Sequence, residues 1–225
     1  MVMIDKLHYI SQPETSAAIA GHPPMPLAAH LIAIEKVLLA GGRWIQLRVK
    51  HRTAEEVLPL AVEASILCKK YGARLIVNDD PLVALKSGAD GVHLGLDDMP
   101  IAEARAILGP EKIIGGTANT LAHIRLRADE GADYIGLGPY RYTTTKQNLS
   151  PILGLQGYVD LIEQAQQMGI MLPVIAIGGI ETEDIPLLMQ TGIHGIAVSG
   201  ALTNQPDLLT QINSIHELLR LPQIN

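Results

Sequence analysis

Three threonines and a lysine stand together in the segment Gly138–Lys146, GPYRYTTTK, directly after the apolar run Asp133–Leu137. A plain turn needs only Gly, Asn or Asp. Hydroxyl groups beside an ammonium group instead indicate a site for a ligand with several negatively charged oxygens. Thr143, Thr145 and Lys146 are therefore candidate contacts to such an anion.

Three further polar residues alternate along the chain at the end of another apolar stretch. Gln46, Arg48 and Lys50 stand two positions apart, and in an extended strand this spacing sends the three side chains toward one side. A solvated strand end would produce the same pattern. Together with the threonine-rich segment, however, the two cations favour a binding site for an anion.

Carboxylates follow two other apolar runs. Asn78-Asp79-Asp80 comes after one run and Asp97-Asp98 after the next. Each acid could simply cap a helix, and for Asp80 capping is the simpler interpretation. If the two runs are neighbouring strands, Asp79 and Asp98 could instead share a hard divalent cation, because Mg²⁺ binds one or two carboxylates together with phosphate oxygens and water. The sequence therefore predicts these two residues as metal ligands.

Two pairs of small residues, Gly178-Gly179 and Ser199-Gly200, follow the last two apolar runs. They could be ordinary tight turns, but such turns at the start of a helix also expose backbone amides that can hold a phosphate. Many barrel proteins bind phosphate after strands seven and eight. A diphosphate near the cations and a second phosphate near these pairs are thus the expected ligands.

The chain shows no obvious covalent chemistry. Cys68 falls in an apolar helical run and is interpreted as a buried structural thiol, and His93 as a hydrogen-bonded histidine within a strand. No Ser/His/Asp triad or Schiff-base lysine is evident. Metal-ligand spacing is also missing among His8, His51, His123 and His194.

Alternating elements must position these residues. Short runs rich in Ile and Val predict eight strands, at Leu7–Ile10, Arg43–Leu47, Arg74–Val77, Gly91–Leu94, Lys112–Ile114, Tyr134–Leu137, Val174–Ile177 and Gly195–Val198. The stretches between them predict helices, at Ala28–Ala40, Ala54–Tyr71, Pro81–Lys86, Ile101–Leu108, Leu121–Ala128, Leu155–Met168, Thr182–Gln190 and Asp207–Leu218. Buried strands that alternate with helices indicate a parallel sheet. Eight such units in 225 residues favour an α/β fold with a single (β/α)₈ TIM barrel over residues 1–225.

The irregular segment Ser11–Pro26 is expected to be a long loop after the first strand. An open Rossmann sheet would need a glycine-rich fingerprint at this point, and the sequence SQPETSA contains none. In a barrel, functional groups gather on the loops at the carboxyl ends of the strands. Every polar cluster named above follows a strand, so we expect all of them at one end of the molecule.

Composition excludes several classes of protein. The hydrophobic content of 48% supports a core of aliphatic residues, since Phe is absent, and a net charge of −6 argues against nucleic acid or an anionic membrane as partner. A single cysteine suits the cytoplasm, and neither a signal peptide nor an apolar run of about 18 residues is visible. The sequence permits a homo-oligomer without specifying one.

Seven segments in order carry a family resemblance: QLRVK, IVNDD, GADGVHLGLDDM, IIGGTANT, GADYIGLGPYRYTTTK, PVIAIGGI and IAVSGA. In these segments, and over nearly its whole length, the chain resembles the thiamine-phosphate synthase (thiamine-phosphate pyrophosphorylase) family. The resemblance implies a Mg²⁺-dependent barrel transferase. It would join 4-amino-2-methyl-5-hydroxymethylpyrimidine diphosphate to 4-methyl-5-(2-phosphooxyethyl)thiazole, or to the carboxylated form of this thiazole, giving thiamine phosphate and pyrophosphate.

The resemblance also implies roles for individual residues. Contacts to the pyrimidine diphosphate would come from Gln46, Arg48, Lys50 and Asn78. The Mg²⁺ ligands would be Asp79 and Asp98. The thiazole phosphate would be held by Thr143, Thr145, Gly179, Val198 and Ser199.

Two further positions complete these roles. Thr117 stands where the family usually has a serine facing the pyrimidine or its leaving group, and Lys146 would reach the pyrophosphate. The residues with a predicted catalytic role are accordingly Arg48, Lys50, Thr117 and Lys146.

Three positions depart from the family pattern. Leu96 replaces a common glutamine, Asn119 replaces a histidine, and Arg141-Tyr142 replaces an apolar–proline pair, with Arg141 expected to add a phosphate contact. The nearest alternative function is that of the thiazole tautomerases, for which the histidine missing at Asn119 is the acid/base candidate. A non-catalytic phosphate-binding relative is a second alternative, but such a protein has little use for two metal-binding carboxylates.

Overall fold

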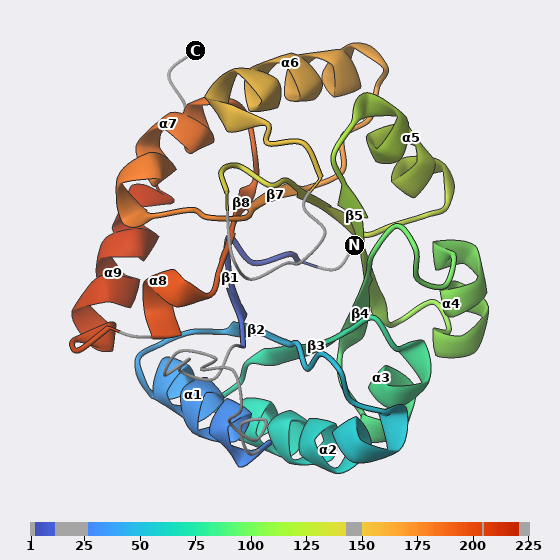
Figure 1. The fold of residues 1–225 in the computed structure, drawn as a ribbon, viewed down its shortest axis with the longest axis vertical. Coiled ribbons are helices and arrows are strands. Elements are labelled where there is room, and N and C mark those ends of the chain that lie inside the picture. Colours follow the sequence, from blue (N-terminus) through green and yellow to red (C-terminus); the bar gives the residue numbers. More distant parts are fainter. Residues whose placement is uncertain (1–2, 12–26, 143–149, 204, 221–225) are drawn as a thin grey trace.

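Eight parallel strands close into a barrel (Figure 1) in this computed structural model, which describes residues 3–11, 27–142, 150–203 and 205–220. The strands pair in chain order and the last pairs with the first. They are β1 (Leu7–Ile10), β2 (Trp44–Leu47), β3 (Arg74–Asn78), β4 (Gly91–Leu94), β5 (Ile113–Ala118), β6 (Tyr134–Leu137), β7 (Val174–Ile177) and β8 (Gly195–Val198). The predicted (β/α)₈ barrel is confirmed.

Helices form a ring around the barrel (Figure 1). In the described residues they are α1 (Ala28–Leu39), α2 (Ala54–Lys70), α3 (Pro81–Ser87), α4 (Ile101–Leu108), α5 (Leu121–Asp129), α6 (Gly154–Gln167), the 3₁₀ helix η1 (Thr182–Asp184), α7 (Ile185–Gln190), α8 (Gly200–Thr203) and α9 (Leu208–Leu218). The sequence did not predict α8, because a single turn is too short to show helical periodicity. Within these ranges, none of the helices has both the length and the apolar character needed to cross a bilayer.

Local sequence explains where two helices begin. The Thr53 hydroxyl accepts a hydrogen bond from the N–H of Glu56, whose carboxylate accepts one from the N–H of Thr53, so a capping box opens α2. Pro59 lies inside α2. Asp80 caps α3 through its Oδ1, which accepts from the backbone N–H of Leu82 at 2.8 Å. The interpretation of Asp80 as a cap is therefore confirmed.

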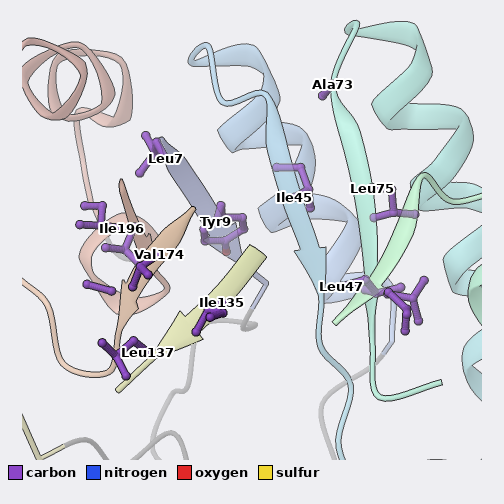
Figure 2. Packing of buried hydrophobic residues seen from close by; sticks show 14 of the residues in the cluster. Leu7, Tyr9, Ile45, Leu47, Ala73, Leu75, Ile135, Leu137, Val174 and Ile196 are labelled. Carbon is purple, nitrogen blue, oxygen red and sulfur yellow. The ribbon is translucent and has the colours of Figure 1, made fainter. Parts of the chain in front are cut away.

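Alternate residues of each strand lie on opposite faces of the barrel wall. Outward residues such as Leu75 and Ile135 belong to the larger buried cluster (Figure 2), which they form with apolar residues of the helices. Inward residues dominate a smaller cluster inside the barrel, consisting of Ile4, Trp44, Ile76, Ile113, Tyr134, Ile175 and Ala197. Apolar side chains fill much of this interior, and most of the predicted polar groups lie at or beyond the strand ends.

Strand β5 is longer than predicted. The sequence indicated Lys112–Ile114, whereas the strand continues through Gly115, Gly116 and Thr117 to Ala118. Glycine is depleted in strands, so this pair gives no strand signal. The pair is explained by close packing instead: a Cβ on Gly115 would lie 2.2 Å from a tyrosine ring, and a Cβ on Gly116 would lie 2.7 Å from an arginine side chain. As a result, Thr117 belongs to the barrel wall rather than to a loop.

Candidate active site

Predicted site residues from four neighbouring strands line one cavity of about 700 Å³. The residues from the ends of β2 to β5, and from the segments that follow these strands, are Gln46, Arg48, Lys50, Asn78, Asp79, Asp98 and Thr117. The fold thus brings together side chains that the sequence presents in separate motifs. We call this space the first cavity.

The carboxylates of Asp79 and Asp98 interact within the first cavity. Asp79 has a left-handed backbone (φ 70°), a conformation that few residues other than glycine adopt, and its Oδ2 accepts a hydrogen bond from Lys50 Nζ. Asp98 Oδ2 accepts one from the backbone N–H of Gly95 at 2.6 Å. Burial raises the pKa of the Asp98 carboxyl above its ordinary value, and Asp79 adds to this rise through its charge and a side-chain hydrogen bond.

This pair of carboxylates fits a magnesium ion that is shared with a ligand. Because Asp79 and Asp98 contact each other, both can bind one cation, which would offset the repulsion between them. Among the described residues there is no group of three or more His, Cys, Asp or Glu that could hold a metal by itself. The two carboxylates match the usual ligands of Mg²⁺, which takes one or two carboxylates and completes its shell with phosphate oxygens and water.

Arg48 lies where the first cavity meets a second one. Arg48 and Thr117 line both cavities. The backbone N–H of Arg48 donates to Ser11 Oγ at 3.1 Å, which ties the segment after β2 to the residue after β1. Burial lowers the pKa of the Arg48 guanidinium, and the charge of Asp79 opposes this shift. An arginine nevertheless stays protonated in proteins, so a partly buried cation stands at the junction of the two cavities.

A chain of hydrogen bonds connects buried side chains of the first cavity. The two ring nitrogens of His93 lie 3.0 Å from the Tyr134 hydroxyl and 3.1 Å from the Thr117 hydroxyl. Tyr134 also forms a hydrogen bond with the Gln46 side chain, while burial raises the pKa of its hydroxyl. The interpretation of His93 as a buried, hydrogen-bonded histidine is confirmed. Through this chain, the orientations of Gln46 and Thr117 are coupled.

The second cavity has a volume of about 1030 Å³ and is lined mainly by residues at or after the ends of β6, β7 and β8, including Gly179, Val198 and Ser199. Gly178 and Gly179 have φ angles of 91° and 70°, which glycine adopts without steric cost. The two pairs of small residues that the sequence associates with phosphate therefore lie at one cavity, which adjoins the first.

Arg141 also lines the second cavity, but its charge is already paired. Its Nη2 donates to Asp184 Oδ1 at 2.6 Å, and its Nη1 lies 3.1 Å from Glu181 Oε2. The backbone N–H of Arg141 donates to Gly178 O at 3.0 Å. The guanidinium thus fastens the segment after β6 to the segment after β7. The phosphate contact expected of Arg141 stays a prediction.

The threonine-rich segment is described only from Gly138 to Tyr142, because Thr143, Thr145 and Lys146 lie outside the described residues. Asn119 Nδ2 donates to the carbonyl oxygens of Gly138 and Pro151, each at 2.9 Å. This buried amide holds the two flanks of the segment together. The sequence marked Asn119 only as a departure from the family pattern.

Two residues at the site gave no functional signal in the sequence. Tyr134 begins a predicted strand and Arg127 lies in a predicted helix, and the sequence singled out neither residue. The structure instead buries Arg127, which donates to the carbonyl oxygens of Gly95 and Thr117. Only the packing of α5 against the strand ends could have indicated this contact.

Comparisons with known sequences show the family of the chain. A family profile described as thiamine monophosphate synthase matches residues 19–202. A thiamine-phosphate synthase of Flavobacterium johnsoniae is 48% identical over 217 residues, which cover 96% of this chain and 97% of that protein. Another, from Bacteroides fragilis, is 50% identical over 187 residues, which cover 83% of this chain and 92% of that protein.

Solved structures give the same result. A thiamine phosphate pyrophosphorylase from Pyrococcus furiosus superposes with a TM-score of 0.77 at 28% identity, over 95% of each chain. A 3-hexulose-6-phosphate synthase has a TM-score of 0.63 at 16% identity, over 95% of this chain and 99% of the other, which shows a common fold alone. The chain is an enzyme of the transferase class that acts in thiamine biosynthesis, and it belongs to the thiamine monophosphate synthase family.

Proposed function

We propose that this enzyme joins 4-amino-2-methyl-5-hydroxymethylpyrimidine diphosphate to 4-methyl-5-(2-phosphooxyethyl)thiazole, or its carboxylated form, and releases pyrophosphate and thiamine phosphate. One observation carries the proposal. The residues that the sequence associates with a diphosphate and a metal line one cavity, and those associated with a second phosphate line the cavity beside it. Two cavities that meet at Arg48 and Thr117 suit two phosphorylated substrates that react at their boundary.

The first cavity would hold the pyrimidine diphosphate. Gln46 and Thr117, coupled through Tyr134 and His93, offer hydrogen bonds to the pyrimidine ring and its leaving group. The diphosphate would be bound by Arg48, Lys50 and Asn78, with Lys146 assigned to the same group from the sequence. Asp79 and Asp98 would hold Mg²⁺, which when bound supplies positive charge to the departing diphosphate.

The reaction needs no protein nucleophile. The bond between the pyrimidine CH₂ group and the diphosphate oxygen breaks, and its electron pair leaves with the pyrophosphate. The electron-rich ring stabilises the positive charge left on the CH₂ carbon. Arg48 and Lys50 stabilise the negative charge that develops on the leaving group, and electrostatic groups held in place before the reaction usually make the largest contribution to catalysis.

The second cavity would place the thiazole for attack. Its phosphate would be anchored by Gly179, Val198 and Ser199, together with the hydroxyls of Thr143 and Thr145. An anchored phosphate holds the ring, and the lone pair of the thiazole nitrogen then forms the new bond to the CH₂ carbon. Such positioning replaces the entropy cost of a collision in solution.

Asn119 argues against the tautomerase alternative. Asn119 stands where that reaction would need an acid/base group, and an amide side chain neither gains nor loses a proton near neutral pH. Its Nδ2 is also committed to two backbone carbonyls. As part of the proposal, the enzyme is one domain over residues 1–225 and acts in the cytoplasm.

The test combines purified protein, Mg²⁺ and both substrates, and measures thiamine phosphate and pyrophosphate. We expect equal amounts of the two products and no turnover with EDTA. Asp79→Asn should slow turnover at least about 100-fold, roughly 2.7 kcal/mol in the barrier. The matched control is Asp80→Asn at the adjacent position, where asparagine caps a helix as well as aspartate does.

The two variants separate the metal assignment from general damage to this loop. Normal turnover by the Asp79 variant at saturating Mg²⁺ would show that Asp79 does not bind the metal. Equal losses in the Asp79 and Asp80 variants would assign the effect to folding. Absence of thiamine phosphate with the unaltered protein would reject the proposed reaction itself.

A further inference from the structure

Arg127 is a buried arginine that joins two strand ends of the active site. It belongs to α5, in the outer ring of helices (Figure 1), yet only 2% of the residue is exposed. Its Nη2 donates to Gly95 O at 2.7 Å and its Nε donates to Thr117 O at 3.2 Å. The third partner is Glu130, whose Oε2 accepts from Nη1 at 2.7 Å.

Stability alone does not explain a buried arginine at this position. Removing a guanidinium from water costs free energy, and well-packed apolar residues often stabilise a buried site as well as an ion pair does. The neighbouring strand is also shaped to admit the side chain, since a Cβ on Gly116 would lie 2.7 Å from Arg127 Cδ. The two carbonyl contacts of Arg127 therefore point to a positioning role in the active site.

The Gly95 contact fixes the turn that carries Asp98. The N–H of Gly95 donates to Asp98 Oδ2 at 2.6 Å, and the N–H of Asp98 approaches Gly95 O at 3.4 Å, so the turn is closed from both ends. Arg127 donates to the same Gly95 oxygen from outside the turn. The side chain of Leu96, within the turn, can supply no hydrogen bond. Arg127 thus holds the backbone on which the Asp98 carboxylate is oriented.

The second contact reaches the neighbouring strand β5, where Thr117 also lines the first cavity. Thr117 O accepts from Arg127 Nε, while the hydroxyl of the same residue faces His93. The two acceptor residues, Gly95 and Thr117, both line the first cavity. A single planar guanidinium therefore sets the spacing between the Asp98 turn and Thr117, and its fixed fork of donors is suited to this task.

We propose that Arg127 is a positioning residue for the divalent cation: by holding Gly95 and Thr117 together it places the Asp98 carboxylate for metal binding. The inference rests on the proposed function for the identity of the cation site. Arg127 touches no substrate, so its replacement acts through Asp98 and Thr117. The affinity for the metal should change more than the affinity for the thiazole phosphate.

The test compares Arg127→Met with Arg105→Met. Arg105, on α4, is the matched control. It donates to the carbonyl oxygen of Lys112 and, at 2.7 Å, to Asp133 Oδ2. These contacts lie at the opposite end of β5 from the active site. The measurements are the Mg²⁺ concentration for half-maximal turnover, the KM for the thiazole phosphate, and the dissociation constant of Mn²⁺ in the presence of inorganic pyrophosphate, followed by electron paramagnetic resonance without turnover.

We expect Arg127→Met to weaken both metal constants about 10-fold, since residues that orient metal ligands typically contribute 10–100-fold to affinity. Arg105→Met should lower the melting temperature but keep both metal constants within about two-fold of the unaltered protein. Arg127→Lys keeps the charge opposite Glu130 and folds more readily, yet a lysine lacks the planar fork. It should therefore weaken the metal constants by an intermediate amount.

Metal constants in folded Arg127→Met or Arg127→Lys protein that match those of Arg105→Met would overturn the proposal. The same holds if the KM for the thiazole phosphate rises as much as the metal constants. The two proposals fail separately. If the unaltered protein forms no thiamine phosphate but binds Mn²⁺ with pyrophosphate, and only the Arg127 variants lose this binding, the reaction is rejected and the positioning role stands.

Discussion

Replacing Asp98 by asparagine should make the protein more stable while it abolishes activity. Burial and the neighbouring Asp79 carboxyl both raise the pKa of Asp98, so its ionised form is disfavoured in the folded state. Asparagine removes the charge but keeps an oxygen for the N–H of Gly95, which now donates to Asp98 Oδ2 at 2.6 Å. The substitution therefore relieves repulsion without opening the turn.

The expected gain follows from the surroundings of the pair. Asp98 is partly exposed, and Lys50 already bonds to Asp79. Charge interactions in such settings amount to about 1 kcal/mol or less after solvent screening. In a chain of this size, about 1 kcal/mol raises the melting temperature by roughly 2–4 °C. Turnover should fall at least about 100-fold, because one of two proposed metal ligands is lost.

The sign of the pH dependence is fixed by the direction of the pKa shift. The pKa of Asp98 is higher in the folded state than in the unfolded state, so the folded protein holds this proton more tightly. The stability of the protein therefore falls as the pH rises from the unfolded pKa of Asp98 through its folded pKa. At neutral pH the unaltered protein carries the full free-energy cost of an ionised Asp98 in the folded state. As the pH falls toward about 4, the ordinary pKa of an aspartate, the unfolded state also takes up the proton, and the advantage of asparagine should shrink.

Thermal unfolding followed by circular dichroism in EDTA, at neutral pH and near pH 4, measures this difference. Asp97→Asn on the exposed neighbour is the control, and its stability should change by no more than about 0.5 kcal/mol. A melting temperature for Asp98→Asn that equals or falls below that of the unaltered protein at neutral pH would refute the reasoning. So would a gain that persists unchanged in acid.

Two further predictions concern Cys68, which is assigned a structural role, and Lys146, which is assigned a catalytic role. Burial raises the pKa of the Cys68 thiol to about 12, so thiol reagents should leave activity intact in the folded enzyme; inactivation that parallels the labelling of Cys68 would contradict its assignment as structural. Lys146→Ala should lower kcat more than it raises the KM for the thiazole phosphate, because the ammonium is assigned to the leaving group. The reverse pattern in steady-state kinetics would place Lys146 in substrate binding.

The sequence alone determined the barrel and most of the cavity lining. Runs of β-branched residues alternate with amphipathic stretches, and this local pattern reports the burial of each element directly, so the strand Gly91–Leu94 and the helix Ile101–Leu108 have their predicted bounds. Because parallel strands share one carboxyl end, the positions of Asp79 and Asp98 in the chain already implied their meeting.

Tertiary structure decided what local patterns do not encode. The glycines of β5 are needed because neighbouring side chains occupy the space of a Cβ, and the sequence gives no sign of those neighbours. Arg127 and Asn119 look like surface residues, yet each bonds to backbone carbonyls far from it in the chain. Such contacts depend on which segments the closed barrel places side by side, and carbonyl acceptors are the same at every residue, so only the assembled fold specifies which ones are used.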